Sequence, residues 1–319
     1  GVLLVADDDQ AHKKLPALRG RRLCMPPRSQ IIALCPARCA GLSENPDPGP
    51  LLPYPDIDPV AIAIGPVPTH RHGLTSLGGL AVAWWSALRR ASRPGAALAR
   101  DQVDDLIFYA AIGIVLGGRL GYSLFYGWEQ LVEDPSWLLR VWQGGMSFHG
   151  GLLGVIAAMY LFARRRGIAF GDVLDFVAPL APVGLGLGRL GNFIGQELWG
   201  RASDVPWAMV FPRDPLQLPR HPSQLYQFAL EGVLLFILLA WFTAGPRPTW
   251  AAAGLFGVGY GCLRFCVEFF REPDAHIGFQ AFGWMTRGQL LCLPMILLGL
   301  IMLAWAYRQA GNTQQQRGN

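Results

Sequence analysis

Apolar residues gather in seven long runs along this chain, and short polar stretches separate each run from the next. The runs cover residues 73–91, 105–126, 146–163, 173–195, 227–245, 250–269 and 288–307. A helix needs about 20 mostly apolar residues to cross the hydrocarbon core of a bilayer. The pattern therefore predicts an all-α integral membrane protein with seven transmembrane helices.

The fourth run is the least regular of the seven. It contains several helix-disfavouring residues, namely Pro179, Pro182, Gly184, Gly186 and Gly188. Membrane helices tolerate such residues when neighbouring helices satisfy the backbone groups that they free. Glycines elsewhere, such as Gly117 and Gly121 in the second run and Gly254 in the sixth, predict close contacts between helices.

The composition agrees with a membrane protein. Apolar residues make up 52% of the chain and charged residues 15%, against about 25% charged residues in ordinary soluble domains. These values exclude a disordered chain, a basic protein that binds nucleic acid and most soluble enzymes. The net charge of +5 arises from short basic clusters between the apolar runs, which is typical of loops at a membrane surface.

The first 55 residues differ from the rest of the chain. They contain both lysines, Lys13 and Lys14, and end in a stretch rich in proline and glycine. We interpret residues 1–55 as a disordered or non-native extension, with a regulatory or targeting tail as the alternative. Residues 56–308 are the predicted membrane domain, and residues 309–319 are a predicted cytoplasmic tail.

The distribution of arginine predicts the orientation in the membrane. The loops after the first, third, fifth and seventh runs hold ten arginines, and the longer loops on the other side hold six. Cytoplasmic loops carry the excess of basic residues in membrane proteins. The C-terminus is therefore expected in the cytoplasm and the N-terminus on the outer side.

Polar side chains interrupt several runs near their outer ends. A side chain of this kind is costly inside a membrane helix, so each is a candidate for a functional site. The candidates are Arg119, His149, Arg189, Asn192, Glu197, Arg264 and Glu268. The predicted orientation brings them to one level near the outer leaflet.

Each candidate has a structural alternative. We assign Arg119 to substrate binding, although an arginine at this depth also reaches the headgroups by snorkelling. Glu268 follows Arg264 by one helical turn and could simply neutralise it. Arg189 and Arg264 suit bidentate capture of a lipid phosphate.

Two further features concern the chemistry. His149 lies in the glycine-rich segment GGMSFHGG, which leaves it open for proton transfer at neutral pH. Asn192 and Glu197 supply hydrogen-bonding groups for a polyhydroxylated headgroup such as glycerol. The Cys35-x3-Cys39 pair has no further ligands at zinc spacing, so we predict no metal site.

Seven segments of the chain together resemble bacterial prolipoprotein diacylglyceryl transferases, over roughly residues 56–308. They are DPVAIAIGP (58–66), GIVLGGRLGYSLFY (113–126), VWQGGMSFHGGLLGV (141–155), GLGLGRLGNFIGQELWGR (184–201), LPRHPSQLYQ (218–227), GYGCLRFCVEFFREPD (259–274) and GQLLCLPMILLG (288–299). The resemblance implies seven membrane helices in the bacterial inner membrane and a small periplasmic head between the fourth and fifth helices.

The resemblance also implies an activity and its residues. The family transfers diacylglyceryl from phosphatidylglycerol to the lipobox cysteine thiol of prolipoproteins, which forms a thioether and releases glycerol phosphate, and no cofactor is implied. The essential histidine of the family matches His149, and its phosphatidylglycerol-binding arginine matches Arg189. Other functional positions of the family match Asn192, Glu197, Gly200, Tyr260 and Arg264.

Two positions depart from the family pattern. His72 stands where the family has a functionally important tyrosine, and Gly195 replaces a second asparagine of the signature. On chemical grounds, we expect the two arginines to stabilise charge on the leaving phosphate. His149 is the expected base for the thiol, and Tyr260 is an orienting group or an alternative proton relay.

Two alternative functions fit the same pattern of spans. Seven helices with buried charge also suit a membrane transporter, but the sequence shows no internal repeat of the kind that many transporters have. An enzyme acting on another membrane lipid phosphate is the second alternative, although such enzymes often use aspartate-rich metal motifs.

Overall fold

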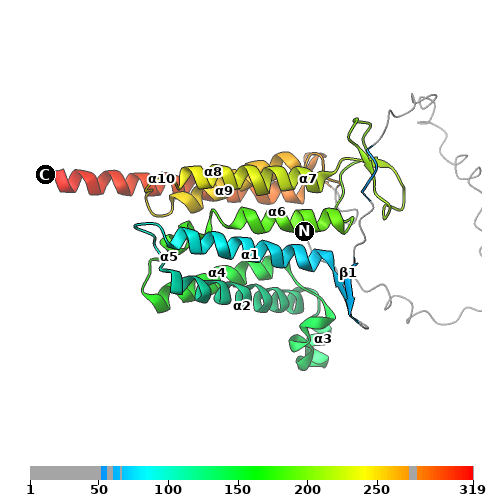
Figure 1. Ribbon diagram of the computed structural model, residues 1–319, viewed down its shortest axis with the longest axis horizontal. Coiled ribbons are helices and arrows are strands. Elements are labelled where there is room, and N and C mark those ends of the chain that lie inside the picture. The colour runs from blue at the N-terminus through cyan, green and yellow to red at the C-terminus, as the bar shows by residue number, and fades with distance from the viewer. Residues whose placement is uncertain (1–51, 56–59, 65–66, 273–278, 319) are drawn as a thin grey trace, which may run out of the picture.

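The fold is a bundle of long helices with small strand pairs at one end, as seen in the computed structural model (Figure 1). The structure describes residues 52–55, 60–64, 67–272 and 279–318. The predicted extension therefore lies almost wholly outside the described residues. The side chain of His72 lies outside them as well.

The first half of the bundle holds four helical segments. They are α1 (Arg71–Ala91), α2 (Arg100–Phe125), α4 (Phe148–Arg166) and the bent pair of α5 (Phe170–Val177) and α6 (Ala181–Ile194). The bend of 44° falls directly before Pro182, which lies in the first turn of α6. Proline fits the first turn because the N–H that it lacks has no helical partner there.

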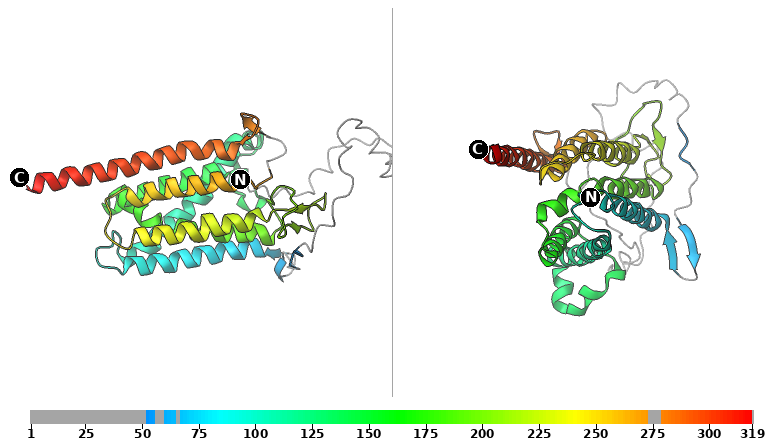
Figure 2. Two further views of the ribbon diagram at one scale, coloured as in Figure 1. Left: turned by 90° about the horizontal axis from the view of Figure 1, so that it is seen from above. Right: turned by 60° about the vertical axis from the view of Figure 1, so that its left-hand side comes forward.

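The second half begins with one long helix that changes type along its length. It consists of α7 (Ser223–Gln227), the π-helical segment η5 (Phe228–Leu234) and α8 (Leu235–Phe242). Then come α9 (Ala251–Val267) and α10 (Arg287–Gly318). Figure 2 shows α10 running along one side of the bundle and reaching past the other helices to the C-terminus.

Glycines hold the closest helix pairs together. A Cβ atom on Gly121 would lie 2.7 Å from the Cα of Gly150, and one on Gly117 would collide with the backbone of the same helix α4. Across α9 and α10, a Cβ on Gly254 would lie 2.9 Å from the carbonyl oxygen of Gly299. The predicted close contacts at Gly117, Gly121 and Gly254 are therefore confirmed.

Three helices are long and apolar enough to cross a membrane. They span Arg100–Phe125, Ser223–Phe242 and Arg287–Asn312, and the bent pair α5–α6 makes a fourth if it forms one span. Helices α1, α4 and α9 cover the remaining predicted ranges. The prediction of a mainly helical membrane protein is confirmed, with three or four candidate spans among the described residues.

Short elements gather at the end of the bundle opposite the C-terminus (Figure 1). Strands pair antiparallel as β1 (Val60–Ile64) with β2 (Val67–His70), β3 (Met209–Val210) with β4 (Pro219–Arg220), and β5 (Phe279–Ala281) with β6 (Met285–Thr286). Between α2 and α4, the α3 loop (residues 126–146) holds α3 (Trp128–Glu133) and the 3-10 helices η3 (Pro135–Leu139) and η4 (Val141–Gln143).

The described chain before α1 packs onto this end. The Tyr54 hydroxyl donates a hydrogen bond to the carbonyl oxygen of Phe193 over 2.9 Å, and its ring lies 5.5 Å from that of Phe211. Leu52 pairs with Met209 through an isolated β-bridge. The packed part of the chain therefore includes Leu52 and Tyr54, which precede the predicted boundary at residue 56.

Candidate active site

Three helical segments bring opposite charges together inside the bundle. Nε of Arg189 on α6 lies 3.7 Å from Oε2 of Glu231 on η5, and Nη1 of Arg264 on α9 lies 3.6 Å from Oε1 of the same carboxylate. The Glu231 side chain is 0% exposed, and those of Arg189 and Arg264 are 20% and 10% exposed. We call these three residues the charged cluster.

Local packing explains why these residues meet. A Cβ atom on Gly186 of α6 would lie 2.9 Å from the Cα of Gly232 on η5. Only two glycines allow such close backbones at this crossing. Because Gly232 follows Glu231 directly, this contact draws the carboxylate toward α6. The π-helical turn of η5 also changes the direction of its side chains, as such turns often do at functional sites.

A second carboxylate supports the cluster from α9. Glu268 forms a 2.6 Å ion pair with Arg264, one helical turn away, and lies 3.6 Å from Arg271. The hydroxyl of Thr286 donates to the same carboxylate over 3.0 Å. The interpretation that Glu268 neutralises Arg264 is confirmed by this ion pair.

Several charged atoms of the cluster lack hydrogen bonds. Both carboxylate oxygens of Glu231 and Nη1 of Arg264 are buried without a hydrogen-bond partner among the described residues. Their ion-pair distances exceed normal hydrogen-bond length. Buried polar atoms are normally satisfied, so the cluster is a place where a ligand can supply the missing polar atoms.

Tyr260 lies one helical turn before Arg264 on α9. Its ring stacks on that of Phe256 at 5.7 Å. The phenol is therefore on the helix that carries Arg264, as the predicted relay requires. The role itself stays a prediction.

The chain beyond Arg189 forms a tight turn. The backbone N–H of Glu197 donates to the carbonyl of Asn192 over 2.9 Å, and Gln196 and Leu198 both adopt φ of 56°. Non-glycine residues rarely take this conformation. Here two side chains from α7 hold the turn through hydrogen bonds to its carbonyl groups. Gln224 donates to the carbonyl of Glu197 over 2.6 Å, and Ser223 to that of Leu198 over 3.0 Å.

Gly200 is fixed where α6, α7 and α9 meet the head, which we define as residues 195–222. Its N–H donates to the carbonyl of His221 over 2.9 Å. A Cβ atom here would lie 2.5 Å from the carbonyl oxygen of Phe270. Any larger residue would therefore displace backbone, which accounts for glycine at this position, and its part in substrate binding stays a prediction.

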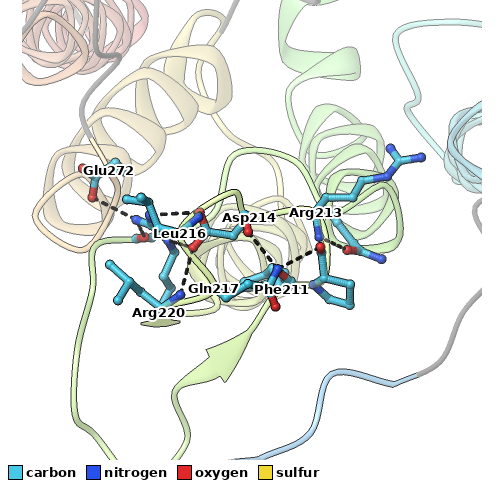
Figure 3. Close-up of polar contacts among 11 residues, drawn as sticks. Phe211, Arg213, Asp214, Leu216, Gln217, Arg220 and Glu272 are labelled. Carbon is cyan, nitrogen blue, oxygen red and sulfur yellow. Dashed lines mark hydrogen bonds and ion pairs between the residues drawn. The ribbon is translucent and has the colours of Figure 1, made fainter. Parts of the chain in front are cut away.

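The head is held by a buried ion pair (Figure 3). Arg220 donates to Asp214 through Nε over 2.6 Å and through Nη2 over 3.2 Å. Gln217 donates to the carbonyls of Phe211, Pro212 and Asp214. Burial raises the pKa of the Asp214 carboxyl, but hydrogen bonds from Arg220 and from backbone N–H groups outweigh this effect and hold the pKa below its usual value.

Arg119 forms hydrogen bonds to the α3 loop. Its side chain is 2% exposed. It donates to the carbonyls of Trp137, Leu138, Gly144 and Gly145, and its guanidinium lies 4.1 Å from the centre of the Trp137 ring. The geometry therefore gives Arg119 the function of fixing this loop, and the predicted contact with substrate stays a prediction.

His149 lies in the first turn of α4, shortly after that loop. Ser147 caps the helix by accepting a hydrogen bond from the N–H of Gly150 over 3.2 Å. The histidine is exposed, and its ring lies 5.7 Å from that of Phe148. Among the described residues it forms no hydrogen bond or ion pair with the charged cluster, so its role as a base stays a prediction.

The comparisons with known proteins agree with one another. The sequence model of the prolipoprotein diacylglyceryl transferase family matches residues 59–305. The chain is 60% identical to the phosphatidylglycerol–prolipoprotein diacylglyceryl transferase of Azotobacter vinelandii, over 81% of this chain and 98% of that protein. The enzymes of the same name from Ectopseudomonas mendocina and Pseudomonas putida are 57% and 55% identical, each over 81% of this chain and 97% of the relative.

The chain belongs to the prolipoprotein diacylglyceryl transferase family. The resemblance inferred from the sequence motifs is therefore confirmed, as is the assignment to transferases of lipoprotein biosynthesis. The charged cluster contains two arginines, a residue type that binds phosphate groups through its guanidinium.

Glu231 is the residue of the charged cluster that the sequence analysis missed. It is the one acidic residue in the apolar run 227–245, so the rule that flagged Arg189 and Arg264 also applied to it. The apolar stretch around Glu231 does not indicate which basic residues pair with its carboxylate. Only the crossing of α6, η5 and α9 shows that it joins the two arginines.

Proposed function

We propose that this chain transfers the diacylglyceryl group of phosphatidylglycerol to the lipobox cysteine of prolipoproteins. The observation that carries the proposal is the charged cluster, in which Arg189 and Arg264 face one buried carboxylate and Nη1 of Arg264 has no hydrogen-bond partner among the described residues, as a phosphate-binding donor requires. The 55–60% identity to enzymes of that name supports it.

The arginines act on the leaving group. The thiolate attacks C3 of the diacylated glycerol, a C–S bond forms, and the C3–O bond to phosphate breaks, so that glycerol phosphate leaves with the bonding electrons. Negative charge grows on the phosphate in this step. Arg189 and Arg264 are held in place by Glu231 and Glu268 before the substrate arrives, and such preorganised cations stabilise the transition state.

The nucleophile needs a base, because a thiol reacts as its thiolate. His149 accepts the thiol proton in the proposal, and Tyr260 orients the reacting groups or relays the proton. Asn192 and Glu197 lie beyond Arg189 and bind the headgroup. The substitution is redox-neutral, so the proposal includes no cofactor and no metal.

The proposed setting is the bacterial inner membrane. Seven helices span it, the head and the charged cluster lie on the periplasmic side, and α10 ends in the cytoplasm. The concentration of the head and the strand pairs at the end opposite the C-terminus (Figure 1) supports this arrangement. The partners are phosphatidylglycerol, the lipid bilayer and prolipoprotein lipobox peptides.

Complementation tests the proposal. The gene is expressed in a bacterium whose own diacylglyceryl transferase is depleted, and growth and lipoprotein modification are followed. We expect rescue by the chain and none by Arg264→Gln at equal membrane abundance. Failure of the unaltered chain to rescue, despite its accumulation in the membrane, would contradict the proposed function.

A further inference from the structure

Two buried glutamines continue the charged cluster toward the head. Gln224 and Gln227 lie three residues apart on α7, which places them on one face of that helix. Their exposures and that of Glu231 are 1%, 1% and 0%. Gln227 is the last residue of α7, four residues before Glu231 in η5 and on the side of the head.

The amide oxygens of both glutamines are unpartnered. Oε1 of Gln224 and Oε1 of Gln227 are buried without a hydrogen-bond partner among the described residues. The amide nitrogen of Gln224 is engaged with the carbonyl of Glu197, which fixes that side chain beside a predicted headgroup residue. A buried polar atom without a partner destabilises the fold, and an apolar side chain would avoid this cost.

The unpartnered atoms are acceptors, so they call for a ligand with hydroxyl donors. The charges nearby narrow the choice of ligand further. Three arginines lie here, namely Arg189, Arg264 and Arg271, together with two carboxylates, Glu231 and Glu268. These five side chains therefore have a surplus of one positive charge. The phosphate of a bound lipid balances this surplus, so the headgroup beyond it needs no charge of its own, as in a neutral diol.

We propose that Gln227 and Gln224 accept hydrogen bonds from the two free hydroxyls of the phosphatidylglycerol headgroup. This inference rests on the proposed function. A lipid whose acyl chains lie in the bilayer places its headgroup glycerol on the outer side of its phosphate. With the phosphate at the charged cluster, the hydroxyls reach the next turn of the helix, where Gln227 lies.

Synthetic lipids that lack one hydroxyl test this contact. Phosphatidylglycerol is compared with lipids whose headgroup is propane-1,2-diol or propane-1,3-diol, using purified chain and a lipobox peptide. We expect kcat/KM to fall by about 10- to 100-fold for at least one of the two lipids, because the enzyme then keeps an unpaired buried acceptor. Equal use of all three lipids by the unaltered chain would overturn the inference without any variant.

The variant Gln227→Met then assigns the contact. It should lower kcat/KM for phosphatidylglycerol to the value that the unaltered chain has with one of the two deoxy lipids. The value of kcat/KM for that deoxy lipid should be the same in the variant and in the unaltered chain. A purely structural glutamine would instead lower all three rates by the same factor, which would overturn the inference.

A matched control comes from α10. Gln289 is also 1% exposed, but its unpartnered atom is the donor Nε2, and its acceptor Oε1 already binds the N–H of Thr286. It offers no free acceptor to a hydroxyl, so Gln289→Met should keep the ratio between the three lipids. Absence of transfer from phosphatidylglycerol by the unaltered chain would refute the proposed function itself. Transfer without discrimination would refute only the headgroup contact.

Discussion

At the scale of single residues, Glu231 organises the candidate site. Its carboxylate separates two guanidiniums that would otherwise repel each other in a buried setting. Removing one partner of a buried ion pair costs about 3–5 kcal/mol, because it leaves uncompensated charge. Glu231 is therefore expected to matter for stability as well as for catalysis.

The variant Glu231→Gln tests this role. We expect its thermal unfolding midpoint in detergent to fall, with a loss of up to about 3–5 kcal/mol in the free energy of unfolding. Glu272→Gln is the control, because that carboxylate is 49% exposed and pairs with Arg220 at 3.4 Å. Equal midpoints for Glu231→Gln and the unaltered chain would show that the carboxylate does not hold the arginines.

The assignment of His149 as the base makes a prediction about pH. A general base acts only when it is deprotonated, so the rate should rise with pH and then level off. His149→Gln has no group that can accept the thiol proton, so it should flatten the rise and lose about 10²–10⁴ in rate. A variant that keeps the same rise at a lower amplitude would move the proton acceptor to another group.

At the scale of elements, the sequence predicts helices better than contacts. Long apolar runs set both ends of α2 and the start of α10 within a few residues, because a 20-residue apolar segment has few alternatives to a helix. The predicted end of α10 is wrong, since the helix continues past the apolar run to Gly318. The pairing of Arg189 with Glu231 depends on the Gly186–Gly232 crossing and on the π-helical turn. Neither the glycine crossing nor the π-helical turn produces a periodic pattern of apolar and polar residues in the sequence.

Arg119 shows the same limit for the α3 loop. The sequence identifies it as a costly cation in a membrane helix, and substrate binding and snorkelling both fit that observation. The four carbonyls that it contacts come from residues 137–145. Their placement depends on the folded loop, so sequence reasoning could not name them.

The head should lose stability in acid because of Asp214. Its pKa is lower in the folded chain than the usual value of about 3.9 for aspartate. A group of this kind stabilises the fold above its unfolded pKa, and the contribution is lost as the pH falls through the folded pKa. The hydrogen-exchange protection factors of residues 195–222, which account for the slower intrinsic exchange in acid, should therefore fall below about pH 4.

Asp214→Asn is the matched variant for that measurement. It removes the charge that Arg220 binds, so protection factors in the head should already be low at pH 7 and should change less on acidification. Identical pH profiles for the variant and the unaltered chain would contradict the assignment to this ion pair.

At the scale of the whole molecule, the described residues before α1 pack against α6 and the head. Tyr54 contacts the end of α6 that carries Arg189 and Asn192. A chain lacking residues 1–50 keeps this contact, and a chain lacking residues 1–55 does not. We expect the shorter deletion to retain transfer activity and the longer one to lower the unfolding midpoint.

Tyr54→Phe is the control for these deletions, because it removes the hydroxyl and keeps the ring between Phe193 and Phe211. It should cost about 0.5–1.5 kcal/mol, the net value of a typical hydrogen bond. Loss of activity on removal of residues 1–50, at equal membrane abundance, would show that the predicted extension is required.

The central claim is that the charged cluster binds the phosphate of phosphatidylglycerol during diacylglyceryl transfer. The most direct test incubates the purified chain with isotope-labelled phosphatidylglycerol and a lipobox peptide, and follows the peptide by mass spectrometry. The account predicts a peptide heavier by one diacylglyceryl group, with release of glycerol phosphate. Arg189→Lys keeps the charge but loses the planar fork, so it should be at least about 10-fold slower, a loss of about 1.4 kcal/mol in transition-state binding. An unmodified peptide, or near-normal transfer by Arg189→Lys, would contradict the account.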